Sequence, residues 1–113
     1  MAQFFFGPSD GVRRELFPRV NARIVWGESI MLSFVHIERG AVVERHSHPH
    51  EQMGMVIEGK AEFIVGDQRR ILQQGDMYWI PGGVEHEVRA VDGPVRALDV
   101  FHPLRQEYME QHG

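Results

Sequence analysis

Four side chains with nitrogen or oxygen donor atoms stand out in two separate parts of the 113-residue chain. His46, His48 and Gln52 are separated by even numbers of residues, and His86 follows much later. Residues two apart in an extended chain project from the same face, so the first three can converge on one point. Three imidazoles and a carboxamide oxygen suit one divalent transition metal ion, such as Ni, Zn, Fe, Mn or Co. Such a set leaves coordination positions open, which is typical of a catalytic or ligand-binding metal site.

A histidine in a strand is more often an ordinary core or surface residue than a ligand, and His-x-His alone is weak evidence for a metal. His36 and His102 are accordingly interpreted as ordinary strand residues. His50 follows Pro49 and is expected at the entrance of a strand, where it could contact the ligands or a substrate.

The composition limits the classes of function. The formal net charge of −4 argues against nucleic acid or an anionic membrane as partner. The chain has no cysteine, which excludes disulfides and thiolate ligands. The N-terminal sequence lacks the pattern of a signal peptide, and no stretch has the length of a transmembrane helix. A cytoplasmic protein is therefore expected.

Short apolar runs separated by glycine and proline predict an all-β sandwich or barrel in a single domain. Glu58-Gly59-Lys60 and Gly66-Asp67-Gln68 are expected to form tight hairpin turns. Only residues 104–111, at the end of the chain, could be helical. The predicted strands are Phe4–Phe6, Ala22–Trp26, Ser29–Glu38, Glu51–Glu58, Lys60–Val65, Arg69–Gln73, Met77–Ile80, His86–Val91 and Pro94–His102.

Residues 40–59 and 75–90 resemble the two signature motifs of the cupin superfamily. The first motif, G-x5-H-x-H-x3-E-x6-G, is matched by Gly40, His46, His48 and Gly59, with Gln52 at the glutamate position. The second, G-x5-P-x-G-x2-H-x3-N, is matched by Gly75, Pro81, Gly83 and His86, with Ala90 at the asparagine position. The resemblance implies a small jelly-roll β-barrel (a double-stranded β-helix) over residues 1–113, with one divalent metal held by His46, His48, Gln52 and His86.

A closer resemblance, over most of the chain, is to the pectin-degradation protein family of single-domain cupins. It rests on His46-Ser-His48-Pro-His50-Glu-Gln52, on Val84-Glu85-His86 and on the segment from Leu98 to Arg105. That family opens the ring of 4,5-unsaturated monouronates from pectin and alginate, giving linear keto sugars. Glutamine is a normal ligand in that family. Its further important residues are matched by Asp99, Phe101 and Arg105.

These three residues suit that chemistry. Asp99 shares one strand face with Val95, Ala97 and Phe101, so its carboxylate is carried inward and could transfer protons. Arg105 could hold a uronate carboxylate bidentately, and Phe101 could form a wall of the pocket. Two alternatives remain open: Asp99 could pair with Arg96 or Arg105 at the barrel rim, and Arg105 could be a solvated tail residue.

The sequence leaves other functions open: another metal cupin, such as a dioxygenase or small-molecule isomerase, or a non-catalytic small-molecule-binding domain. The preferred interpretation is an enzyme acting on a small anionic sugar-like substrate. A homodimer is also expected, with Phe4–Phe6 as an edge strand that pairs across a two-fold axis.

Overall fold

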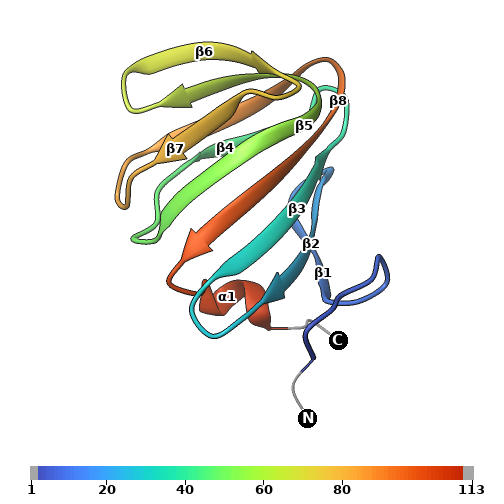
Figure 1. Ribbon diagram of the computed structural model, residues 1–113. Coiled ribbons are helices and arrows are strands. Elements are labelled where there is room, and N and C mark those ends of the chain that lie inside the picture. The colour runs from blue at the N-terminus through green and yellow to red at the C-terminus, as the bar shows by residue number, and fades with distance from the viewer. Residues whose placement is uncertain (1–2, 111–113) are drawn as a thin grey trace.

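The computed structural model describes residues 3–110 of the chain. The strands build one antiparallel sheet in the order β1-β2-β3-β8-β5-β6, with β4 beside β8 and β7 beside β5 (Figure 1). The elements are β1 (Val12–Phe17), β2 (Val20–Trp26), β3 (Met31–Ile37), β4 (Val42–His46), β5 (Glu51–Val65), β6 (Gln68–Gln73), β7 (Met77–Ile80), β8 (His86–His102) and α1 (Gln106–Met109).

The two longest strands, β5 and β8, shape the barrel because each belongs to both halves of the sheet. The first half of β8 pairs with β4 and with the end of β5, whereas its second half pairs with β3 and with the start of β5. The bent sheet thus encloses a core in which Ile24, Met31, Val56 and Val95 are fully buried. The predicted all-β jelly-roll barrel is confirmed, and Figure 1 shows β5 and β8 running between its two ends.

One predicted hairpin is wrong. β5 continues through Glu58-Gly59-Lys60, where its pairing with β8 shifts register at a bulge. Gly59 has φ of 89°, and a Cβ there would collide with the backbone of Pro94 on β8. Glycine bends the strand instead of reversing it, since it alone tolerates this φ and this close approach. The second predicted turn is confirmed: Gly66-Asp67 connects β5 to β6, with Val65 paired with Gln68.

The N-terminal prediction is also wrong. Phe4–Phe6 form no strand; Phe4 and Phe5 are exposed to 80% and 88%. The first strand is instead β1. Its sequence is mostly polar, so it lacks the alternation of apolar and polar residues by which a half-buried strand is recognised. The predicted helix is limited to α1, although the end of its predicted range lies outside the described residues. Among the described helical residues, none form a helix long and apolar enough to cross a membrane.

Candidate metal centre and adjoining cavity

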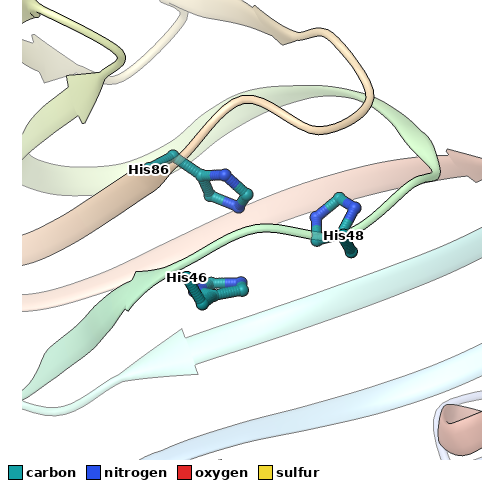
Figure 2. Close-up of side chains that lie close together, drawn as sticks. All are labelled: His46, His48 and His86. Atoms are coloured by element: carbon teal, nitrogen blue, oxygen red, sulfur yellow. The ribbon is translucent and has the colours of Figure 1, made fainter.

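Three histidines from different parts of the fold meet at one end of the barrel. His46 ends β4 and is the direct cross-strand partner of His86, the first residue of β8. His48 lies in the turn between β4 and β5. One ring nitrogen from each histidine lies within 4.8 Å of the others, and the three rings face a common space (Figure 2). The predicted convergence of these three residues is therefore present in the structure.

The route to this convergence differs from the expected one. The expected convergence relies on the alternation of an extended chain, but the chain turns between β4 and β5. His46 and Gln52 consequently lie on different strands. Local alternation is therefore the wrong reason for their proximity, which depends on how both strands pair with β8.

Backbone carbonyl groups orient all three rings. A ring nitrogen that donates a hydrogen bond to a carbonyl carries the proton, so the other nitrogen keeps its lone pair for a metal. In each ring the carbonyl contacts Nδ1, which leaves Nε2 facing the common space. The contacts are His46 with the carbonyl oxygen of Glu44 at 2.6 Å, His48 with that of His50 at 3.1 Å, and His86 with that of Val84 at 2.9 Å.

The surroundings of the rings keep two of them uncharged. Burial lowers the pKa of His48 to about 4, with further lowering from the nearby Arg105 cation and the other histidines. Burial also lowers the pKa of His86 to about 4, despite the opposing hydrogen bond to Val84. Both imidazoles are therefore neutral at pH 7, the state that binds a metal ion.

Gln52 completes the donor set. Its side chain is buried, and its Oε1 lies 3.0 Å from Nε2 of His48. With the His48 proton on Nδ1, two lone pairs face each other at this contact, and a cation between them would satisfy both. Neighbouring ligands at about 2.1 Å from one ion are separated by about 3 Å when they subtend a right angle. The residues present thus fit a divalent transition metal ion.

A row of four residues crosses the inner face of the sheet beside the histidines. Ser33 on β3 pairs with Asp99 on β8, Asp99 with Gly54 on β5, and Gly54 with Tyr78 on β7. The Tyr78 hydroxyl donates a hydrogen bond to Oδ1 of Asp99. A Cβ at Gly54 would come within 3.0 Å of both side chains, so the glycine leaves the space in which they meet.

Asp99 therefore has a different partner from those considered in the sequence. Arg96 is exposed and pairs with Glu58 at 3.7 Å. Burial raises the pKa of Asp99 to about 6, although hydrogen bonds from Tyr78 and Gln52 and the charge of Arg105 oppose this shift. Burial, followed by the nearby carboxylate, raises the pKa of Tyr78 well above its usual value, so its phenol stays protonated. Sequence reasoning missed Tyr78; a glycine inside an alternating strand, Gly54, was the available signal.

Arg105 is buried, which rules out a solvated tail residue. Its guanidinium carbon lies 3.9 Å from the ring centroid of Tyr108 and 5.0 Å from that of Phe101. Its Nε donates a hydrogen bond to Glu107 at 2.9 Å. The arginine thus lies over the rings of Tyr108 and Phe101, with its charge close enough to His48 and His86 to lower their pKa values. Tyr108 was missed because nothing in the terminal sequence indicates which residue packs on the arginine.

These groups line one cavity of about 50 Å³. This volume has room for a few water molecules and is smaller than a sugar ring. Its walls combine apolar side chains with a smaller set of polar groups, as is usual for ligand sites. The polar lining residues are Ser33, His46, Gln52, Tyr78, His86, Asp99, Arg105 and Tyr108.

Comparison with known proteins identifies the class. Residues 33–101 match the family model of the cupin domain, and the chain belongs to the cupin family. Within this family it is similar to the pectin degradation protein KdgF of Dickeya dadantii (strain 3937), at 29% identity over 101 residues that make up 88% of this chain and 86% of that protein. The solved structure of KdgF from Halomonas sp. has a TM-score of 0.84 at 28% identity, covering 94% of this chain and 98% of that one. Both resemblances that the sequence indicated are confirmed.

A shorter similarity is to a protein that is named as a lyase. Dimethylsulfoniopropionate lyase DddQ of Ruegeria pomeroyi (strain ATCC 700808 / DSM 15171 / DSS-3) is 33% identical over 72 residues. These residues make up 63% of this chain and 36% of that protein. The similarity to KdgF extends along nearly the full length of both partners, and it is the more informative of the two.

Proposed function

We propose that this protein is a metal-dependent enzyme that opens the ring of 4,5-unsaturated monouronates to give linear keto sugars. The observation that carries the proposal is the arrangement of three groups: three converging imidazoles, of which those of His46 and His86 line the cavity, a buried carboxyl group held by Tyr78, and a buried arginine. Similarity to KdgF proteins along nearly the whole chain supports the same substrate class.

The metal ion would be held by His46, His48, Gln52 and His86. When bound, it would supply a Lewis acid that polarises an oxygen of the substrate. The ligands are neutral, so the ion keeps its full positive charge in the site, which favours an anionic substrate. The similarity to a pectin degradation protein supports a sugar acid as the substrate.

Asp99 is proposed to move the protons of the reaction. Ring opening removes a proton from the anomeric hydroxyl, breaks the bond between the anomeric carbon and the ring oxygen, and leaves that oxygen as an enol. Tautomerisation then moves the enol proton to the neighbouring carbon, without any oxidant or reductant. A carboxyl group with a pKa of about 6 can accept and return protons near neutral pH. Tyr78 fixes its orientation.

Arg105 is proposed to bind the uronate carboxylate, and Phe101 to form the wall beside the sugar. Aromatic rings on the guanidinium hold the planar fork in place before substrate arrives. The cavity is smaller than the sugar, so we propose that only the reacting edge of the substrate enters it.

The direct test is to incubate the metal-loaded protein with 4,5-unsaturated galacturonate and to follow the loss of enol-ether absorbance. Elemental analysis of the same sample identifies the ion. Two further assays test other reactions: cleavage of dimethylsulfoniopropionate for lyase activity, and oxygen consumption for dioxygenase activity. Loss of absorbance that requires the metal supports the proposal, whereas unchanged absorbance with turnover in another assay contradicts it.

Arg105→Lys provides a test of the carboxylate contact. Lysine keeps the charge but lacks the planar fork and its stacking on Tyr108. We expect KM for the unsaturated uronate to rise by about 10-fold or more, with a smaller change in kcat and unchanged metal content. Steady-state kinetics with elemental analysis measures all three. An unchanged KM would show that Arg105 does not bind the carboxylate.

We also propose that the protein is a homodimer, through a surface other than the expected edge strand. The outer face of an antiparallel sheet is usually polar. Here two neighbouring cross-strand rows of apolar residues span β3, β8, β5 and β7, and the first also includes Val25 on β2. The rows are Val25, Leu32, Val100, Met53 and Trp79, and Phe34, Leu98, Met55 and Met77.

The exposed area of this face is sufficient for a second copy. Seven side chains on the face or in the N-terminal segment, whose Phe6 lies beside the face, are 40–88% exposed, namely Phe4, Phe5, Phe6, Leu32, Met53, Met77 and Trp79. Together they expose on the order of 800 Å², which is the share each partner contributes to a standard interface. Methionine and aromatic residues without charges are also typical of interface centres.

Met77→Glu is expected to convert the dimer to a monomer at micromolar concentration, because it buries a charge among apolar side chains. Met77 is 73% exposed, so the variant should fold. Ile71→Glu is the control, since Ile71 is 57% exposed on β6 and lies outside both rows. Light scattering coupled to size exclusion gives the mass. A monomeric parent protein, or a dimeric Met77→Glu variant, refutes the proposed interface.

A further inference from the structure

Ser33 has a buried hydroxyl without a hydrogen-bond partner among the described residues, although it lies at one end of the polar row, next to Asp99. Its side chain is 0% exposed, and its Oγ has no partner among the described residues. Burying a hydroxyl without a hydrogen bond destabilises the fold, because the group loses its hydrogen bonds to water and gains none. Such an atom in the core of a small barrel requires an explanation.

The position of Ser33 suggests what the hydroxyl contacts. Ser33 is the direct cross-strand partner of Asp99, which places their Cβ atoms about 5 Å apart on the inner face. Both residues line the same cavity as Arg105, Gln52 and His86. Its neighbours along the inner face of β3, Met31 and Val35, are apolar and buried. The Ser33 hydroxyl is thus a polar group on a strand face whose neighbouring residues belong to the hydrophobic core.

From this geometry we infer that Ser33 is a substrate-binding residue whose hydroxyl holds a sugar oxygen beside Asp99. The inference rests on the proposed uronate function and deepens it by naming a residue that neither the sequence motifs nor the comparisons indicate. The hydroxyl can donate to a ring or hydroxyl oxygen and accept from a sugar hydroxyl. A sugar oxygen at this position would give the hydroxyl the hydrogen-bond partner that the described residues do not provide.

Ser33→Ala tests the inference, because the affinity for a sugar should fall if the hydroxyl binds substrate and should stay unchanged if the hydroxyl only fills space in the core. Removing an unpaired buried hydroxyl should leave the free energy of unfolding unchanged or raise it. If the hydroxyl holds the sugar, the same variant should bind D-galacturonate, a saturated and unreactive probe, about 3- to 10-fold more weakly. We expect a comparable loss in kcat/KM on the unsaturated uronate, with unchanged metal content. Isothermal titration calorimetry, thermal unfolding and steady-state kinetics provide these readouts.

Ser29→Ala is the matched control, since Ser29 is exposed in the turn between β2 and β3 and should change none of these quantities. Parent-like affinity and kinetics in Ser33→Ala would overturn the inference and leave Ser33 as a packing residue or a site for water. The proposed function fails separately, if the parent protein does not turn over the unsaturated uronate. Weaker galacturonate binding by Ser33→Ala would still support the contact in that case.

Discussion

His48→Ala is expected to lose most of its bound metal, with an affinity at least about 100-fold below that of the parent protein. Changes to groups that merely support a ligand already cost about 10- to 100-fold, and this change removes a ligand itself. His48 is buried and its Nδ1 contacts a backbone carbonyl, so the turn itself orients the ring toward the other ligands. Elemental analysis after dialysis measures the effect.

A control separates the metal site from a general effect of losing histidine. His36 lies on the outer face of β3, away from the cavity, and His36→Ala should retain the metal. Added metal should raise the melting temperature of the parent and of His36→Ala, because it binds only the folded state. It should not do so for His48→Ala. Equal metal content in both variants would refute the assigned ligands.

Asp99→Asn is expected to lower kcat by about 10²–10⁴-fold, the usual contribution of a general acid or base. Asparagine has the same size, and its carbonyl oxygen can still accept the hydrogen bond from Tyr78. It cannot take up a proton, so catalysis should fail while the fold and the metal content are preserved. The measurement is steady-state turnover of unsaturated galacturonate alongside elemental analysis.

The control for this change is Asp67→Asn, in the exposed turn between β5 and β6, which should keep the parent rate. If Asp99→Asn also turns over at the parent rate, Asp99 is a structural partner of Tyr78 and the metal alone would have to promote the reaction. A loss of metal in Asp99→Asn would instead show that the carboxylate supports the ligands, because Gln52 hydrogen-bonds to it.

Several features followed from the sequence because their cause is local. Histidine and glutamine carry the donor atoms wherever they lie, so the candidate ligands could be named from residue type and motif spacing. Strict alternation along β8 places Val95, Ala97, Asp99 and Phe101 inward, as predicted. The Gly66-Asp67 turn was also predictable, since two residues there determine the hairpin.

Other features depend on the pairing of strands that are distant in the sequence. Glycine is typical of turns, but Gly59 lies in a bulge, where the backbone of Pro94 on another strand comes too close for a side chain. Phe4–Phe6 have the residue types of a strand, yet they pair with no strand among the described residues. Propensity describes a single segment, whereas sheet pairing is a property of the whole barrel.

The residues that line the cavity were likewise predictable only in part. Its metal-binding residues were visible in the sequence, but the polar row beside them was not, because it joins Ser33, Gly54, Tyr78 and Asp99 from four strands. Their meeting depends on registers set by the whole sheet, and a shift of one residue in any strand would turn a member outward. The sequence by itself determined which atoms could bind a metal and which face of β8 is buried. Only the tertiary structure decided which hydroxyl holds Asp99, which rings hold Arg105 and which serine remains unpaired, because those contacts exist only once the barrel has closed.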